Sequence, residues 1–103
     1  MEELINETLR IASEKFLTFG FKEEQIEQLL ASGKRDLGKE LEKLKALVEE
    51  EPADIEKINK TLHALKGLFY NMGNTDAGDR MSDLRNEDEA EKEIETIKTL
   101  LHR

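Results

Sequence analysis

The chain has 103 residues, of which 39% are charged, with a formal net charge of −8 at pH 7 and no cysteine. The lack of cysteine excludes disulfides and thiolate chemistry, and the negative charge argues against nucleic-acid binding, which needs clustered lysine and arginine. No apolar run approaches the roughly 20 residues of a membrane span, and the acidic opening MEELINETLR does not resemble a secretory signal. We therefore expect one small cytoplasmic domain over residues 1–103, with no membrane or nucleic-acid partner.

The spacing of apolar residues predicts a first helix over residues 2–18 and a second over residues 22–50. Gly20 suits the C-terminal cap of the first helix, because a residue without a Cβ accepts the left-handed conformation of such caps. The second helix has one apolar stripe, and Gly33 lies on it, which indicates a close approach to another helix. Pro52 ends the second helix, since the residue before a proline is disfavoured in helical conformation.

The third predicted helix covers residues 52–72 and has the most regular apolar pattern in the chain. Asp54 lies in its first turn, where a negative charge is favourable, and Gly73 ends it. Its core stripe recurs at spacings of 3, 4, 3, 4 and 3 and comprises Ile55, Ile58, Leu62, Leu65, Phe69 and Met72. One side of this helix is therefore expected to face the core along its full length.

Two shorter helices are predicted after Gly73. The first has Asn74 or Thr75 as N-cap and an inward face that comprises Ala77, Met81 and Leu84. The pattern then changes phase, so we place a break near Asn86, which with Glu89 three residues later forms a variant of the capping box. The last helix has a new stripe, made of Ala90, Ile94, Ile97 and Leu101. Since no segment alternates with a period of two, the sequence predicts an all-α antiparallel four-helix bundle with an accessory N-terminal helix.

A second stripe lies on the third predicted helix, about a third of a turn away from the core stripe. At positions i, i+3, i+4 and i+7 it comprises His63, Lys66, Gly67 and Tyr70, and Glu56 and Asn59 extend it toward the N-terminus. His63 is therefore expected to be exposed, with a cation one turn away and no side chain at Gly67. A glycine in a helix interior costs roughly 1 kcal/mol relative to alanine, so Gly67 needs a compensating role.

These residue types suit phosphoryl chemistry. An exposed imidazole is largely neutral and nucleophilic at pH 7. If His63 accepts a phosphoryl group, Lys66 can balance the charge on its oxygens, and Gly67 leaves room for the rim of a partner's active site. His102 has no such neighbours, and we interpret it as structural. The sequence contains no phosphate-binding loop and no Glu-x-x-His pair, so no metal site is predicted.

The stretch HALKGLFYNMG resembles the signature of histidine-containing phosphotransfer domains, which is H-x-L-K-G followed six residues later by a second glycine. The matching residues are His63, Leu65, Lys66, Gly67 and Gly73. Members of this family fold as four-helix bundles and relay phosphoryl groups between aspartates of receiver domains. The resemblance implies that His63 accepts and donates the phosphoryl group, that Lys66 stabilises it and that Gly67 gives access to it.

The partner-binding surface is expected to include Asn59, Tyr70 and Arg85. The family often has glutamine or glutamate at the position that Arg85 occupies. If Arg85 faces His63, it provides a second cation for the phosphoryl group, and if it points to solvent, the site has only Lys66. Tyr70 could equally lie over the bundle surface with its hydroxyl in water and have no docking role.

The resemblance implies receiver domains of response regulators, a sensor histidine kinase, or both as partners of a monomeric chain. It implies no cofactor on this chain, with Mg²⁺ held by the receiver, since no carboxylate cluster here suits it. Phosphorylation from ATP by the chain itself is not expected. The dimerising helix of sensor kinases has a proline shortly after its histidine, whereas Leu68 and Phe69 follow Gly67 here.

Two alternatives stay open. A chemotaxis-type kinase could phosphorylate His63 directly, although the start at Met1 and the lack of a trailing linker favour a free-standing shuttle. The chain could also be a helical adaptor that binds a receiver-like protein without taking up phosphate. Against the adaptor stands the pair of Lys66 and Gly67, for which such a protein has no need.

Overall fold

The secondary structure confirms the predicted all-α class. The computed structural model describes residues 1–85 and 90–102, and these form helices and no strand. The helices in this part of the chain are α1 (Glu2–Thr18), α2 (Glu23–Glu49), α3 (Ile55–Asn71), α4 (Thr75–Arg85) and α5 (Ala90–Leu101). None of them is both long enough and apolar enough to cross a bilayer.

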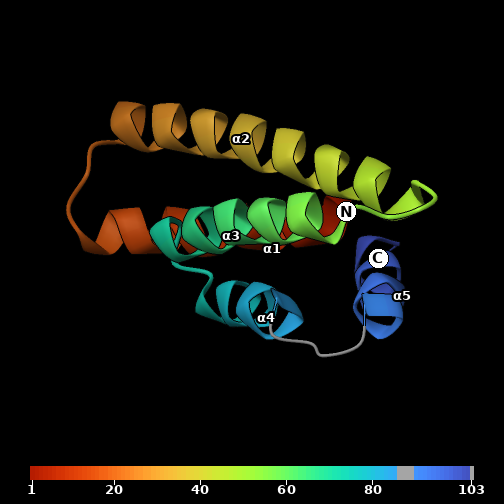
Figure 1. Cartoon of the computed structure of the whole chain (residues 1–103). Coiled ribbons are helices and arrows are strands. Elements are labelled where there is room, and N and C mark those ends of the chain that lie inside the picture. Colours follow the sequence, from red (N-terminus) through yellow and green to blue (C-terminus); the bar gives the residue numbers. More distant parts are fainter. Residues whose placement is uncertain (86–89, 103) are drawn as a thin grey trace.

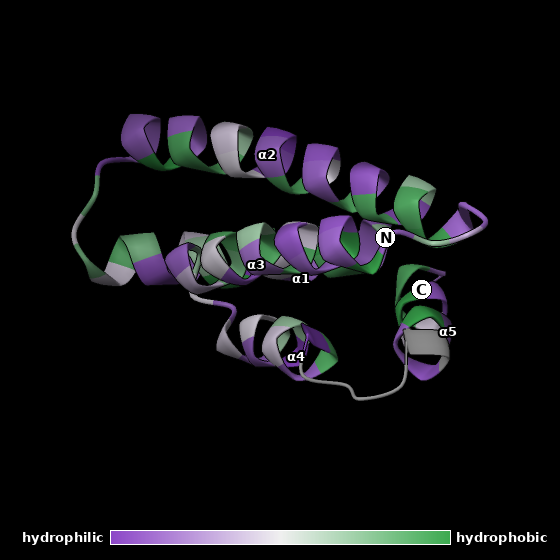
Figure 2. Ribbon diagram, viewed as in Figure 1, coloured by the Kyte–Doolittle hydropathy of each residue, from purple (hydrophilic) through white to green (hydrophobic). Residues whose placement is uncertain are grey.

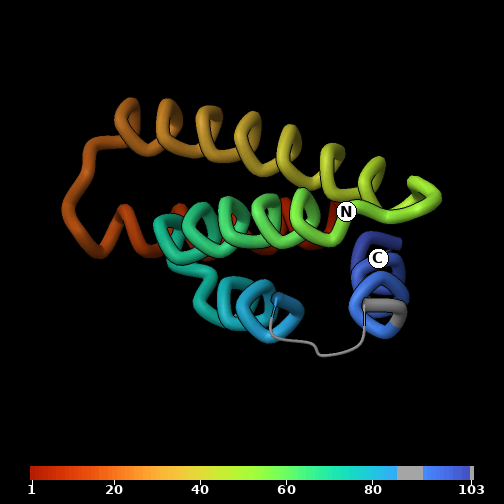
Figure 3. The backbone as a smooth tube through the Cα atoms, viewed as in Figure 1, coloured from red at the N-terminus to blue at the C-terminus, as the bar shows by residue number. Residues whose placement is uncertain are grey.

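The three longest helices lie alongside one another, and the molecule is elongated, with extents of 46 × 21 × 20 Å. α2 and α3 run in opposite directions, and α1 packs against α2 (Figure 1). After a tight turn α4 packs against α3, and α5 lies near the C-terminal end of α2, which the backbone tube also shows (Figure 3). The two ends of the described chain meet, because the Met1 ammonium donates a hydrogen bond to the Leu101 carbonyl at 3.0 Å.

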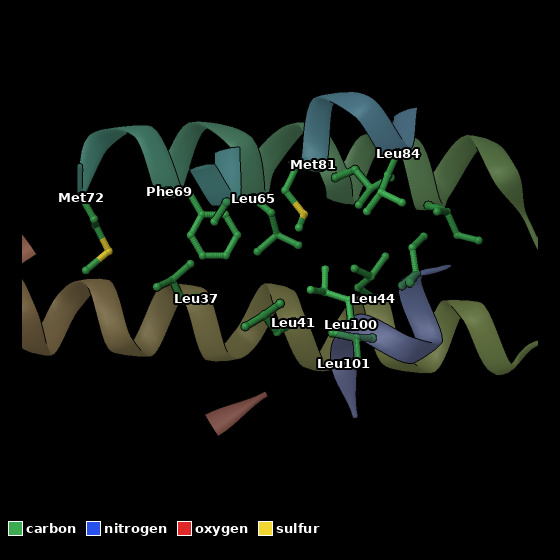
Figure 4. Packing of buried hydrophobic residues seen from close by; sticks show 14 of the residues in the cluster. Leu37, Leu41, Leu44, Leu65, Phe69, Met72, Met81, Leu84, Leu100 and Leu101 are labelled. Carbon is green, nitrogen blue, oxygen red and sulfur yellow. The ribbon is translucent and has the colours of Figure 1, made fainter. Parts of the chain in front are cut away.

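The core lies between the helices and takes apolar side chains from each of them. On α2 the hydrophobic residues face the other helices and the hydrophilic ones face outward (Figure 2). Leu37 of α2 points toward Phe69 of α3, and Leu44 of α2 lies near Leu100 and Leu101 of α5 (Figure 4). The apolar side chains with no exposed surface are Ala12, Leu37, Leu41, Leu44, Ile58, Leu62, Leu65, Phe69, Met81 and Ile97. The predicted stripe on the third helix is thus confirmed, except that Ile55 is only half-buried.

Most predicted helix limits agree with the structure, but the predicted start of the third helix at Pro52 is wrong. α3 begins at Ile55, and Asp54, expected inside the first turn, is its N-cap. The Asp54 carboxylate accepts a hydrogen bond from the Lys57 backbone N–H at 3.2 Å. An aspartate at this position satisfies an N–H group that has no partner within the helix, and so it determines where the helix starts.

The turn between α3 and α4 shows which of two candidate residues caps α4. The Asn74 side-chain oxygen accepts a hydrogen bond from the Ala77 backbone N–H at 3.2 Å, so Asn74 is the cap and Thr75 the first helical residue. The Asn74 amide also donates to the Thr8 hydroxyl at 2.8 Å, which joins this turn to α1. The break predicted near Asn86 agrees with the end of α4 at Arg85, whereas the capping role of Asn86 and Glu89 falls outside the described residues.

The geometry tests the predictions for the glycines, and Gly20, with a φ of +80°, has the left-handed conformation expected of the residue that ends the first helix. A Cβ at Gly33 would clash with the Met72 thioether, so the Met72 side chain fills the space that this glycine leaves on α2, and the close approach of two helices predicted there is a side-chain contact. Gly73 has a φ of +84° and follows the end of α3, as expected for a left-handed C-terminal cap. The tight turn that Gly73 allows directs α4 back along α3, and this brings the end of α4 toward the middle of α3.

Candidate functional site

His63 lies on the outer face of α3, as predicted. Its side chain is exposed, whereas Leu62 and Leu65 on either side of it are fully buried. Because successive side chains of a helix are about 100° apart, burial of these two leucines directs His63 away from the core. The imidazole is therefore accessible to a partner molecule.

Arg85, the last residue of α4, faces His63. Its Nη1 lies 3.1 Å from the His63 Nδ1. Met81 and Leu84 hold α4 in the core, with exposed fractions of 0% and 6%, and so place Arg85 beside α3. The structure thus favours the first of the two orientations considered for Arg85, in which its cation is next to the imidazole. Because a guanidinium can only donate hydrogen bonds, the His63 Nδ1 accepts this one.

A shallow hollow of about 340 Å³ lies beside His63, between α3 and the end of α4. It is lined by Glu56, Asn59, Lys60, His63 and Arg85. Two buried polar atoms of these residues, the Asn59 Oδ1 and the Arg85 Nε, have no hydrogen-bond partner within the described structure. Lys60 and Glu56 form an exposed ion pair with an Nζ–Oε1 distance of 3.7 Å. The contact with His63 thus leaves the buried Arg85 Nε–H, a donor of a charged group, without a hydrogen bond.

The residues on the C-terminal side of His63 form a separate group. The Tyr70 hydroxyl donates a hydrogen bond to the Asp79 carboxylate. This bond is the main reason why the pKa of Tyr70 is raised above its ordinary value of 10.0, and the negative charges of Asp79 and Asp83 add to the effect. The Tyr70 ring occupies the space left by Gly78, where a Cβ would clash with the ring. The Lys66 ammonium lies over the same ring, 5.9 Å from its centroid.

Gly67 is open to solvent. A Cβ added there would meet no atom within 4 Å outside its own helix turn, and its φ is not positive. Neither packing nor backbone conformation therefore requires a glycine at this position. The absence of a side chain leaves free space one turn along α3 from His63, as the access hypothesis requires.

The predicted site residues thus fall into two groups. The fold brings His63, Asn59 and Arg85 together around the hollow, whereas Lys66 and Tyr70 form their own contact next to Gly67. The other histidine, His102, is exposed near the end of α5 and does not line this hollow. Within residues 1–85 and 90–102, no group of three or more histidine and carboxylate side chains is placed to hold a metal ion.

Three residues that contribute to the site were not predicted from the sequence: Lys60, Gly78 and Asp79. Lys60 precedes His63 by three residues, as Lys66 follows it by three, and this symmetry was a signal that could have been used. Gly78 and Asp79 hold the Tyr70 ring and hydroxyl, and a glycine inside a short predicted helix was the available clue. No local pattern indicates that these two residues face Tyr70.

Comparisons with known proteins gave no match: no family model matches the chain, and neither a curated protein nor a solved structure is significantly similar to it. The functional interpretation therefore depends on the chemistry of the site itself.

Proposed function

We propose that this chain is a histidine phosphotransfer protein that accepts a phosphoryl group on His63 from a receiver-domain aspartate and passes it to another receiver. One observation carries the proposal: an exposed imidazole lies beside a guanidinium, next to open space at Gly67. A nucleophile needs access for the donor, and a transferred phosphoryl group needs cations around its oxygens. His63, Gly67 and Arg85 meet these needs, with Lys66 one turn away.

The same proposal interprets α2 to α5 as the four antiparallel helices of such a domain and α1 as an accessory helix. In its support, the buried apolar residues of α2, α3, α4 and α5 belong to one cluster. The contribution of α1 to the fully buried or nearly buried apolar residues is limited to Ala12 and Phe16.

The transfer step follows from the chemistry of an acyl phosphate. The His63 Nε2 lone pair forms a bond to phosphorus while the bond between phosphorus and the aspartate oxygen of the donor breaks. The donor is left as a carboxylate, and the imidazole loses its Nδ1 proton to solvent. Mg²⁺ belongs to the receiver, where it would neutralise charge on the phosphoryl oxygens. Return transfer to a second aspartate reverses these steps, so His63 acts only as an intermediate carrier.

The decisive experiment uses a panel of receiver domains phosphorylated with acetyl phosphate and incubated with the parent chain, His63→Gln and His102→Gln. We expect the parent and His102→Gln to take up phosphate in an acid-labile form, and His63→Gln to take up none. Both histidines are exposed, so either substitution should change the free energy of unfolding by no more than about 0.5 kcal/mol. His102→Gln is therefore a matched control for His63→Gln.

Two results would contradict the proposal: phosphate on the His63→Gln protein, or no phosphate on the parent from any receiver. In the second case, incubation with a chemotaxis-type kinase and ATP distinguishes the remaining alternatives. Labelling of His63 by that kinase would favour direct phosphorylation. Binding to a receiver without labelling would favour a helical adaptor.

A further inference from the structure

The hydrogen bond between Arg85 and His63 has a consequence for the reactivity of the imidazole. Arginine is protonated throughout the accessible pH range and has no acceptor atom, so Arg85 must be the donor. At 3.1 Å its Nη1–H points to the His63 Nδ1, which must then carry a lone pair. A neutral imidazole has one proton for two nitrogens, so the proton is on Nε2.

We propose that Arg85 is a positioning residue that holds His63 in its non-nucleophilic tautomer until an incoming phosphoryl group draws the guanidinium away. In the resting contact the Nδ1 lone pair is occupied by Arg85, and Nε2 carries a proton instead of a lone pair. Neither nitrogen can then attack phosphorus. This inference depends on the proposed phosphotransfer function for its biological role, but the tautomer itself does not.

The transfer step requires the opposite tautomer. Attack by Nε2 needs a lone pair on Nε2 and therefore a proton on Nδ1, where it would meet the Arg85 N–H. Arg85 must consequently leave Nδ1 before the N–P bond forms and the O–P bond of the donor breaks. Once the phosphorylated imidazole has lost the Nδ1 proton to solvent, the Nδ1 lone pair returns. The hydrogen bond from Arg85 can then form again.

The surroundings of Arg85 make an anion the natural trigger for its release. Its Nε–H is buried and has no partner in the described structure, so the resting contact leaves one strong donor unused. A phosphoryl group offers several oxygens and can accept two parallel hydrogen bonds from a guanidinium, whereas the imidazole accepts one. Turning from Nδ1 to the phosphoryl oxygens therefore improves the bonding of Arg85. It also frees Nδ1 to take up a proton from solvent while Nε2 gives its own proton to solvent.

The first measurement requires no variant and no phosphate. We expect ¹⁵N NMR of the parent chain at mildly alkaline pH to show His63 almost entirely with its proton on Nε2. His102 is exposed and serves as the internal reference for an imidazole that populates both tautomers in water. If His63 shows the same tautomer mixture as His102, the inference is wrong, whether or not His63 proves to be phosphorylated.

The second measurement uses Arg85→Met, which keeps an unbranched apolar stem at this position and removes every hydrogen-bond donor. Arg80→Met is the matched control, because Arg80 is an exposed residue of the same helix that does not line the hollow. Diethyl pyrocarbonate reports imidazole nucleophilicity and carries no phosphoryl group. We expect Arg85→Met to raise its rate of reaction with His63 on the order of tenfold, the factor set by one charged hydrogen bond, and to leave the His102 rate unchanged.

The same substitution should have the opposite effect on the rate of phosphotransfer. Arg85→Met should slow transfer from a phosphorylated receiver, because the phosphoryl oxygens lose a cation. An unchanged diethyl pyrocarbonate rate at His63 in Arg85→Met would overturn the inference. A parent with the Nε2–H tautomer that no receiver phosphorylates would instead refute the proposed function and leave the tautomer assignment intact.

Discussion

The two sides of His63 on α3 are built differently. Toward the N-terminus, Asn59 and Lys60 line an open hollow that Arg85 enters from α4. Toward the C-terminus, Lys66 lies over the Tyr70 ring beside the open space at Gly67. Residues at i−3 and i+3 from His63 are thus both lysines, but only the first lines the hollow.

The difference between the two sides has its origin in α4. On the C-terminal side, Gly78 and Asp79 hold the Tyr70 ring in place, and the ring attracts the Lys66 ammonium through the charge distribution of its face. On the N-terminal side α4 ends, and its last residue, Arg85, contacts His63 of α3. α4 therefore holds the Tyr70 ring in place on one side of His63 and supplies the Arg85 cation on the other.

The largest difference in transfer rate should appear when Lys66 and Lys60 are replaced separately. Lys66→Ala should slow transfer to and from a receiver on the order of 10- to 1000-fold, because Lys66 supplies charge to the phosphoryl oxygens but not the bond-forming atom. Lys60→Ala makes the same chemical change at the same sequence distance and is the matched control. We expect it to slow transfer less than about tenfold, since Glu56 already pairs with Lys60. Rapid-quench kinetics measure the transfer rates of both variants. Equal decreases in rate would mean that the two sides of His63 do not differ.

A second test concerns the open space at Gly67. Gly67→Gln should keep the fold but slow phosphotransfer with receivers on the order of 10- to 100-fold. The added side chain would push the receiver away from His63, so that the imidazole and the phosphoryl group are no longer aligned. A small donor such as phosphoramidate should be hindered much less. Gly38→Gln is the control, because Gly38 is also helical and a Cβ there meets no atom within 4 Å.

Substitutions at Gly67 also distinguish a role in partner access from a role in stability. Gly67→Ala should stabilise the chain by about 1 kcal/mol, which corresponds to a rise in melting temperature of roughly 4–8 °C. Thermal unfolding and phosphotransfer are measured on the same proteins. Transfer by Gly67→Gln at the parent rate would contradict the access hypothesis, and a lower melting temperature for Gly67→Ala would show that the glycine serves packing.

The smallest effect is expected at Tyr70. Its pKa is raised above 10.0 by the hydrogen bond to Asp79, so the folded chain favours the protonated hydroxyl. The stability that this bond contributes is present below pH 10 and is lost as the pH rises through the folded-state pKa. Tyr70→Phe lacks the bond, so its free energy of unfolding should fall below that of the parent at pH 8 and approach it above pH 10. Urea unfolding across this range measures the difference, and a constant difference would show that the hydroxyl does not couple to folding.

The sequence by itself determined the helices and, most clearly on α3, the side that is buried; on α5 the predicted Ile97 and Leu101 are buried, but Ile94 is only half-buried. The apolar spacing of α3 predicted that Ile58, Leu62, Leu65 and Phe69 are buried and that His63 is exposed, and the structure agrees. This succeeded because residues of one helix are related by a rotation of about 100° per residue, so the burial of some dictates the direction of the others. Most helix ends followed in the same way from local capping residues, although α3 begins at Ile55, after the N-cap Asp54, and not at Pro52.

Only the tertiary structure decided which side chains meet across helices. The 3.1 Å contact between Arg85 and His63, and the direction of Lys66 toward Tyr70, depend on where α4 lies along α3. That register is set by Gly73 in the turn and by Met81 and Leu84 in the core, acting together. The periodicity of one helix contains no information on its position along another, because packing positions depend on the fit of all the buried side chains at once.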